Sequence, residues 1–198
     1  MPPTPLPGRR WAALLTATLL TAALAQAARA ETPAARLLPG SEISFTTHQM
    51  GVPVEGHFGK FSADIALDPK QPAQGRVALT IDTGSARFGT PELDTEIGKP
   101  EWLATARFGQ ARFQSSAIRA AGPGRFEVSG QLTLKGITRP LVVPVQLVQT
   151  GTQGVASGSF TIKRLDFKVG EGEWTDTSML ADDVLVKFKL ALAGLPAS

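Results

Sequence analysis

The chain has 198 residues, with 20 Lys and Arg against 17 Asp and Glu, and it contains no cysteine. The lack of cysteine excludes disulfides, thiolate metal sites, a cysteine nucleophile and covalent haem attachment. Three arginines lie within the first 30 residues, so residues 31–198 carry 17 basic and 17 acidic side chains. This balance argues against a basic nucleic-acid surface, and we expect no nucleic-acid partner.

The first 30 residues have the pattern of a secretory signal peptide. Arg9 and Arg10 supply positive charge, residues 11–25 are apolar apart from threonines, and Ala28-Arg29-Ala30 has the small residues of a cleavage site. This apolar run of about 15 residues is shorter than the roughly 20 that span a bilayer. We therefore expect cleavage after Ala30, export to the periplasm, and a flexible lead-in over residues 31–40.

From residue 41 onward, apolar and polar side chains alternate with a period of two, which indicates strands with one buried and one solvated face. The alternating runs cover residues 43–47, 61–67, 77–81, 126–134, 141–147, 160–162 and 184–192. Turn signals at Asp68-Pro69, at residues 121–124 and at residues 150–152 separate runs at hairpin-like intervals. Roughly eight antiparallel strands without long helices between them favour a closed barrel or a sandwich.

Within the Val52–Ile65 region the alternation changes phase. Val54 and Phe58 occupy even positions, whereas Phe61 and Ile65 occupy odd ones, so one residue must be absorbed between them. We predict a bulge at Gly59-Lys60, because a bulge lets a strand bend enough for a barrel to close.

One segment, residues 91–105, breaks the strand pattern altogether. Thr90 suits a helix N-cap, Pro91 suits the first helical position, and acidic residues follow in the first turn. Lys99-Pro100-Glu101 has the pattern of a second short helix start. We predict a helical cap over this segment, between strands.

Several stretches together resemble the YceI-like family of exported proteins. The most specific is the string from Gly130 to Pro140, which reads Gly-x-Leu-Thr-Leu-x-Gly-x-Thr-Arg-Pro. The other matching stretches are Ile43-Ser44-Phe45, Gln49-Met50-Gly51-Val52, Gly56-His57-Phe58 with Phe61, Ala111-Arg112-Phe113-Gln114-Ser115 and Arg164-Leu165-Asp166-Phe167.

The resemblance covers residues 39–193 and implies an all-β fold, an eight-stranded antiparallel lipocalin-like barrel with a short helical insert. It places the barrel domain at residues 41–193 and a tail at residues 194–198. It also implies an apolar interior that binds polyisoprenoids such as quinone tails. The family often has His directly before Met-Gly, where this chain has Gln49. The helical insert of this chain also differs from the family pattern over residues 93–103. In this respect the chain resembles the branch found near membrane b-type cytochromes.

Residues suited to catalysis or metal binding are few. His48 and His57 are the only histidines, they form no H-x-x-x-H or H-E-x-x-H pattern, and they lack an evident third metal ligand. No nucleophile-elbow pattern G-x-S-x-G is present. We therefore expect no enzyme activity, no catalytic residue, no metal site and no covalent cofactor.

The predicted ligand-binding residues follow inward strand phase and motif position. We expect an apolar interior with Trp102 near one opening and Gln49 as a polar contact; the interior residues are Phe45, Met50, Phe58, Phe61, Ile65, Phe113, Phe126 and Phe160. An eight-stranded barrel either just fills its interior or holds one small ligand.

Two functions are therefore open. The first is a periplasmic carrier of an isoprenoid quinone, a polyprenyl lipid or another long apolar chain. The alternative is an interaction module with a filled barrel that docks on a membrane b-type cytochrome or another envelope partner. The sequence leaves the oligomeric state open, a dimer included.

Overall fold

The computed structural model describes residues 34–197, and the expected signal peptide lies outside them. Within this range no helix is long and apolar enough to cross a bilayer. The strands are β1 (Ala34–Leu37), β2 (Glu42–Gln49), β3 (Val52–Phe58), β4 (Phe61–Ala66), β5 (Arg76–Asp82), β6 (Ala86–Arg87), β7 (Gln110–Gly122), β8 (Arg125–Leu134), β9 (Ile137–Thr150), β10 (Gln153–Lys163) and β11 (Asp183–Ala193). The helices are α1 (Pro91–Glu96) and the short 3₁₀ turns η1 (Pro72–Gln74), η2 (Thr83–Ser85), η3 (Arg164–Phe167) and η4 (Gly172–Thr175).

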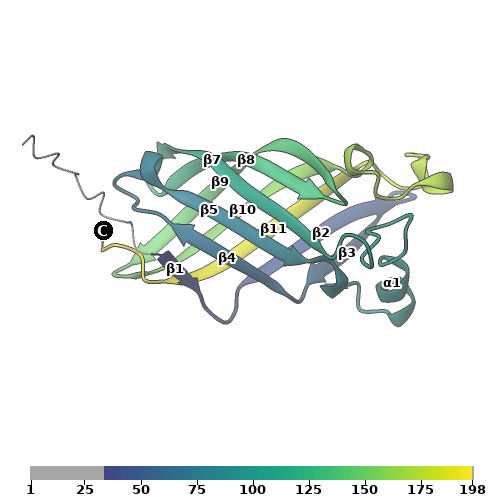
Figure 1. Ribbon diagram of the computed structural model, residues 1–198, viewed down its shortest axis with the longest axis horizontal. Coiled ribbons are helices and arrows are strands. Elements are labelled where there is room, and N and C mark those ends of the chain that lie inside the picture. The colour runs from purple at the N-terminus through teal and green to yellow at the C-terminus, as the bar shows by residue number, and fades with distance from the viewer. Residues whose placement is uncertain (1–33, 198) are drawn as a thin grey trace, which may run out of the picture. The chain divides into compact units, whose positions relative to one another are not determined.

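The strands form a closed antiparallel barrel (Figure 1). The ring runs β1-β4-β5-β7-β8-β9-β10-β11, and β1 closes it by pairing with both β4 and β11. β2 pairs with the first half of β11, β3 pairs with β2, and β6 pairs with β3, so these strands extend the wall toward α1. Closure leaves the ring without the exposed edges that invite aggregation. The predicted eight-stranded barrel is confirmed.

The wall beside α1 contains β3 and β6, and each is separated from a strand of the ring by a short break in the chain. β3 and β4 are separated by Gly59 and Lys60, and β5 and β6 by η2. Phe58 and Phe61 both pack against the core although they are three residues apart, so the predicted change of phase is confirmed. It coincides with an interruption of the strand, where the backbone N–H of Lys60 donates to the Ser85 hydroxyl at 3.0 Å.

Residues at both ends of the barrel domain contribute to the core, which corrects the expected boundaries. The lead-in is not flexible throughout, because its residues 34–37 form β1 and bury Ala35. In the expected tail, Leu195 is 1% exposed and joins the core cluster. The backbone N–H groups of Gly194 and Leu195 both donate to the Thr152 carbonyl, which fixes the tail over the end of the barrel.

Three phenylalanine rings cover inward-facing glycines on neighbouring strands. A Cβ on Gly56 would collide with the ring of Phe45, and a Cβ on Gly130 or Gly158 would collide with a phenylalanine ring and with a backbone carbonyl. Gly158 lies directly opposite Phe188 in the β10–β11 ladder. Glycine in a strand marks close approach of this kind, and it allows the local bending that a small barrel needs.

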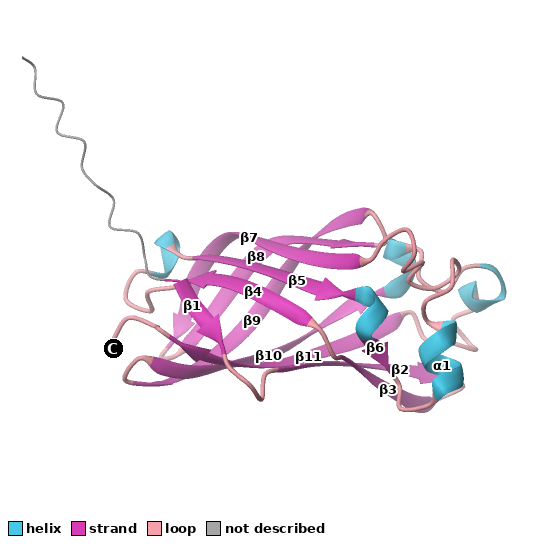
Figure 2. Ribbon diagram, turned by 60° about the horizontal axis from the view of Figure 1, so that its bottom comes forward, coloured by secondary structure: helices cyan, strands magenta, loops and turns pink. Residues whose placement is uncertain are grey.

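The predicted helical cap is shorter than expected. Only α1 is helical, and residues 97–107 form a series of hydrogen-bonded turns. Pro100 lacks an N–H donor, and Ala104 has a φ of 48°, which no α-helix contains. Figure 2 shows that α1 and most of the short helical turns gather at one end of the barrel. We call this end the mouth; the C-terminus lies at the opposite end (Figure 1).

Candidate functional site

The barrel interior contains two adjoining cavities. The outer cavity, at the mouth, has a volume of about 250 Å³. The inner cavity, deeper in the barrel, has a volume of about 120 Å³. Five side chains line both cavities and mark the place where they meet: Ile43, Ile81, Leu132, Phe160 and Val186. The two cavities therefore lie side by side in the barrel, and we call the five side chains between them the waist.

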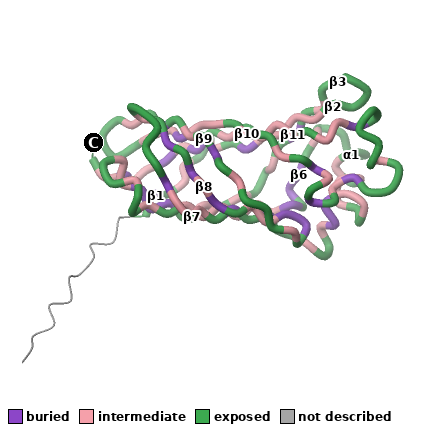
Figure 3. The backbone as a smooth tube through the Cα atoms, turned by 90° about the horizontal axis from the view of Figure 1, so that it is seen from above, coloured by how far each residue is buried: buried purple, intermediate pink, exposed green. Residues whose placement is uncertain are grey.

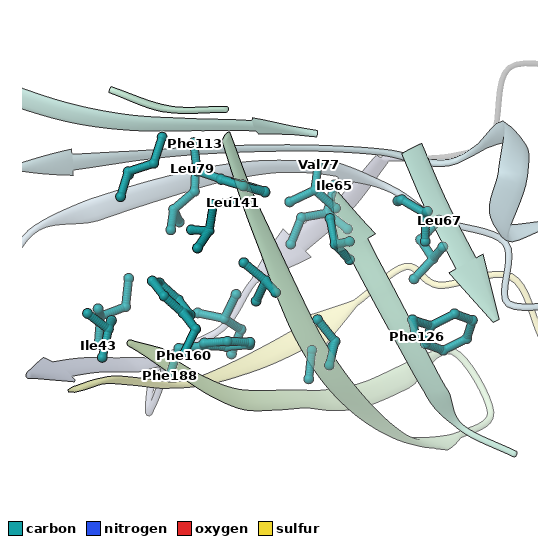
Figure 4. A pocket seen from close by; sticks show the side chains of 18 of the residues that line it. Ile43, Ile65, Leu67, Val77, Leu79, Phe113, Phe126, Leu141, Phe160 and Phe188 are labelled. Atoms are coloured by element: carbon teal, nitrogen blue, oxygen red, sulfur yellow. The ribbon is translucent and has the colours of Figure 1, made fainter. Parts of the chain in front are cut away.

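The inner cavity is lined by aliphatic and aromatic side chains from all around the ring (Figure 4). Its lining includes Ile65 and Leu67 from the β4 side, Phe113 from β7 and Phe126 from β8. Arg112 is the one charged residue that borders it, and this residue is exposed on the outside of β7. A ligand in this chamber meets only apolar surface, so its binding energy there comes from removing apolar area from water.

The outer cavity is bounded by strands on one side and by loops on the other. Phe45, Phe58 and Phe88 form a connected aromatic group, with ring centroids of Phe45 5.1 Å from Phe58 and 5.3 Å from Phe88. Its polar lining residues are Thr47, Gln49, Glu96 and Arg164. Polar groups are therefore confined to the mouth side of the interior.

Two loops together cover the mouth: the insert, residues 88–108, and the β10–β11 loop, residues 164–182. The Trp102 and Trp174 rings, one from each loop, lie 5.2 Å apart between centroids. The carbonyl of Glu101 accepts backbone hydrogen bonds from Gly170 and Glu171 at 2.8 and 3.0 Å. The indole N–H of Trp102 donates to Glu96 at 3.3 Å. These contacts make the two loops a single cover.

Arg164 organises the β10–β11 loop from the inside. Its guanidinium is buried and donates to five carbonyls of this loop, those of Val169, Gly170, Trp174, Leu180 and Ala181. Burial lowers the pKa of Arg164, and the nearby Asp182 charge opposes this effect. Because all five donors are used within the loop, Arg164 is a positioning residue and has no donor left for a ligand.

Lys135 fixes the same loop to the turn between β8 and β9. This residue has a φ of 50° and its ammonium group is almost fully buried. The ammonium donates to the Lys168 carbonyl at 2.6 Å and to the Glu171 carboxylate at 2.9 Å. The hydrogen bond from Lys135 lowers the pKa of Glu171 below its usual range. The most specific part of the sequence motif therefore holds the cover in place.

Most of the residues expected in the interior do line the cavities. Phe45, Gln49, Phe58 and Trp102 line the outer cavity, Ile65, Phe113 and Phe126 line the inner cavity, and Phe160 lines both. Phe61 packs against the core and lines neither chamber. Whether these residues bind a ligand stays a prediction.

The expectation that Met50 faces the interior is wrong. Met50 is 75% exposed, since it occupies the turn between β2 and β3 rather than an inward strand position. Met50 was expected inside because it belongs to the family-like stretch Gln49-Met50-Gly51-Val52, not because of strand alternation. The inward residues of β2 are the odd-numbered ones, such as Ile43 and Phe45. By the same alternation His48 points outward, and His57, opposite Ser44, lines neither cavity.

Sequence reasoning missed the lining residues that the cover contributes. Trp174, Val169 and Leu180 come from the β10–β11 loop, and Phe88 and Ile97 come from the insert. No period marks such residues, because they lie in loops; those of the β10–β11 loop are held in place by Arg164 and Lys135. The shared residues Leu132 and Val186, by contrast, lie on strand phases that the alternation did identify as inward.

The arrangement offers shelter for an apolar molecule and little machinery for chemistry. Within residues 34–197 no group of three or more His, Asp or Glu side chains is placed to hold a metal ion. The polar groups at the mouth are already engaged, since Glu96 accepts from Trp102 and pairs with Lys99. Near the opening, the Thr47 hydroxyl donates to the Asp183 carbonyl at a long 3.5 Å, and Gln49 is the other polar side chain that borders the cavity.

The sequence pattern of the YceI-like domain matches residues 39–192, which is most of the chain. A UPF0312 protein of Shewanella baltica is 33% identical over 112 residues, covering 56% of this chain and 59% of that protein. A UPF0312 protein of Vibrio cholerae is 30% identical over 132 residues, covering 65% and 70%. The match to the Shewanella protein thus spans less than two thirds of its length.

Solved structures share the barrel. BcnA of Burkholderia cenocepacia is 42% identical with a TM-score of 0.74, covering 76% of this chain and 95% of BcnA. A domain of Saccharophagus degradans, described as polyisoprenoid-binding and implicated in plant cell wall breakdown, has a TM-score of 0.66 at 16% identity, covering 82% and 98%. At this low identity the second likeness establishes the fold alone.

Proposed function

The chain belongs to the YceI-like family, and we propose that it binds a long apolar lipid chain along the axis of its barrel and carries it without breaking a bond. The observation that carries the proposal is the pair of adjoining cavities, whose polar lining is confined to the mouth. Burial of apolar ligand surface contributes about 25 cal/mol per Å² before the costs of association. The polyisoprenoid-binding description of the Saccharophagus domain supports an isoprenoid as the ligand class.

The chemistry of the lining favours selection by tail length rather than by head group. A head group is recognised where buried polar partners are left unpaired by the wrong ligand. Here Arg164 and Glu96 are occupied by protein groups, and the Thr47 hydroxyl donates to the Asp183 carbonyl, so Gln49 is the main remaining polar contact. A neutral amide does not titrate, so we expect binding to be nearly independent of pH between 5.5 and 7.5.

The test is a titration with isoprenoid quinones that share a head group and differ in tail length, together with mass spectrometry of lipids extracted from the protein purified from its native source. We expect affinity to rise with tail length and an apolar chain to be found in the extract. Affinity that ignores tail length, or disappears when only the head group changes, contradicts the proposal. The alternative of a filled barrel docking on a membrane b-type cytochrome is disfavoured, because the two cavities leave the interior unfilled.

We also propose that the carrier works in the periplasm after cleavage behind Ala30, on the strength of the charged, apolar and small-residue segments of the first 30 residues. N-terminal sequencing of the periplasmic fraction should give Glu31 as the first residue. Recovery of soluble protein with Met1 intact contradicts this part of the proposal.

A further inference from the structure

Large apolar side chains are exposed around the mouth, and one of them, Leu93, also borders the outer cavity. Met50 is 75% exposed, Val52 63%, Leu93 43% and Met179 42%. They come from the β2–β3 turn, the start of β3, α1 and the β10–β11 loop, and Met50 donates its N–H to the Met179 carbonyl at 2.8 Å. Figure 3 shows the exposed course of β3 and α1 at this end. An exposed apolar patch rimmed by polar residues marks an interaction site.

Met50 is both an exposed apolar side chain and a residue in an unfavourable backbone conformation. It has a φ of 50° and Gly51 a φ of 80°, so both central turn residues are left-handed. Hairpin turns of this kind prefer Asn or Asp before the glycine, because a bulky side chain is strained there. Lys135-Gly136 has the same turn conformation, but the Lys135 side chain is buried in contacts within the protein, whereas Met50 is exposed.

Charge indicates what that contact is. The three segments that build the mouth, residues 48–55, 88–108 and 164–183, carry eleven Asp and Glu against four Lys and Arg. The remainder of residues 31–198 carries six acidic and thirteen basic side chains. Arg87, Lys135 and Lys163 neutralise one mouth acid each by ion pairing, and the mouth still keeps an acidic surplus. An anionic membrane repels such a face, whereas a cationic surface attracts it.

We propose that the mouth face, meaning Met50, Val52, Leu93 and Met179 with the acidic residues around them, docks on a protein partner that presents Lys and Arg around an apolar centre. The apolar side chains supply the desolvated centre of the interface and the acids supply its rim and its orientation. The inference deepens the proposed function, because docking at the mouth joins the cavity opening to the surface that delivers or receives the ligand.

Two valines of equal exposure provide a matched test. Val52 lies at the mouth and Val148 lies on the outer face of β9, and each is 63% exposed. A photo-crosslinking p-benzoylphenylalanine replaces either one in cells of the native source. We expect a discrete protein adduct from position 52 alone, with the crosslinked peptide of the partner rich in Lys and Arg.

Charge reversal completes the test. The adduct should fall at least tenfold when Glu92→Lys and Glu173→Lys are combined, and should persist with Asp64→Lys and Glu127→Lys, which reverse two exposed acids away from the mouth. Equal adducts from positions 52 and 148, no adduct, or an adduct that ignores the mouth charges overturns the proposal. So does flotation of the protein with vesicles of phosphatidylcholine and phosphatidylglycerol that is lost in Met50→Ser, which assigns the face to a membrane.

The quinone titration on the same variants separates the two proposals. Normal quinone binding without a charge-dependent adduct rejects the docking face alone. A charge-dependent adduct from a protein that binds no quinone rejects the carrier function alone.

Discussion

The waist between the two chambers should determine how much of a long tail the barrel holds. Leu132 lines both cavities and projects inward from β8. Replacing Leu132 by tryptophan places a much larger side chain in the waist. The indole ring should close the inner cavity to a ligand that enters from the mouth. The change leaves the polar lining residues of the outer cavity in place, although Leu132 borders that cavity too. We therefore expect Leu132→Trp to shorten the tail that the protein can accommodate.

The volume of the inner cavity sets the size of the effect. Filling empty apolar space is worth about 24 cal/mol per Å³, so a tail that fills about 120 Å³ gains about 3 kcal/mol. Since about 1.4 kcal/mol corresponds to a factor of ten, Leu132→Trp should weaken binding of a long-tailed quinone about 100-fold. A quinone with a tail short enough to stay in the outer cavity should lose far less affinity, because the rest of the outer cavity's lining is unchanged.

The assay is a calorimetric or fluorescence titration with a short-tailed and a long-tailed quinone of the same head group. Val142→Trp is the control, because Val142 is 54% exposed on the outside of β9 and receives the same bulk away from the cavity. Thermal unfolding of each variant verifies that the barrel remains folded. Equal losses for both quinones, or none for the long one, would refute the two-chamber interpretation.

Three further predictions concern the wall and the cover. Gly158→Ala should destabilise the barrel by about 1–3 kcal/mol in urea unfolding, because its Cβ collides with the Pro144 carbonyl and the Phe188 ring; Gly59→Ala, whose Cβ meets only the Ser85 carbonyl at 3.7 Å, should change stability far less. The Lys135–Glu171 pair should stabilise the cover fully above pH 4.5, the usual pKa of Glu171, and this stabilisation should be lost as pH falls through the lowered pKa of the folded state. Hydrogen exchange of residues 168–176 should show the change. Glu171→Gln should remove that pH dependence. Trp102→Ala should change the rate of quinone uptake more than the melting temperature, because Trp102 lies in the cover, where its ring contacts Trp174, and belongs to no strand. Unchanged uptake kinetics would place the entrance elsewhere.

The regular part of the barrel could be predicted from the sequence because alternation reports directly which side of a strand is buried. Phe126, Val128 and Leu134 on β8 and Val143 and Leu147 on β9 are buried as their phase indicates. No knowledge of the partner strands is needed for this inference, since each strand carries its own pattern.

Two strands of the eight-stranded ring, β7 and β1, escaped the pattern for identifiable reasons. In β7, Ala111 and Phe113 are buried at odd positions and Ile118 at an even one, and a register shift between Ser115 and Ala117 separates them. This irregularity breaks the period of two. β1 has four residues with little alternation, and it exists because β4 and β11 both leave ladder positions for it to fill.

The site divides between what is local and what is not. The inner cavity is built from strand positions, and its lining follows from phase. The outer cavity depends on the cover, whose side chains point inward because Arg164 donates to five carbonyls of one loop. A lone arginine in a sequence gives no sign of such a role, because the carbonyls that accept its hydrogen bonds belong to every residue alike.

This division also determines where the barrel can open. Separating two barrel strands breaks a continuous hydrogen-bonded ladder and exposes the core. The ladder between β10 and β11, for example, extends over eleven residue pairs. Opening the cover breaks the Trp102–Trp174 contact, two backbone hydrogen bonds to Glu101 and the ion pair between Lys135 and Glu171. Local openings draw on the least stable part of a fold, so the cover opens long before the wall does. A ligand that enters there meets the polar mouth first and the apolar inner chamber last, and the tail therefore determines how tightly it is held.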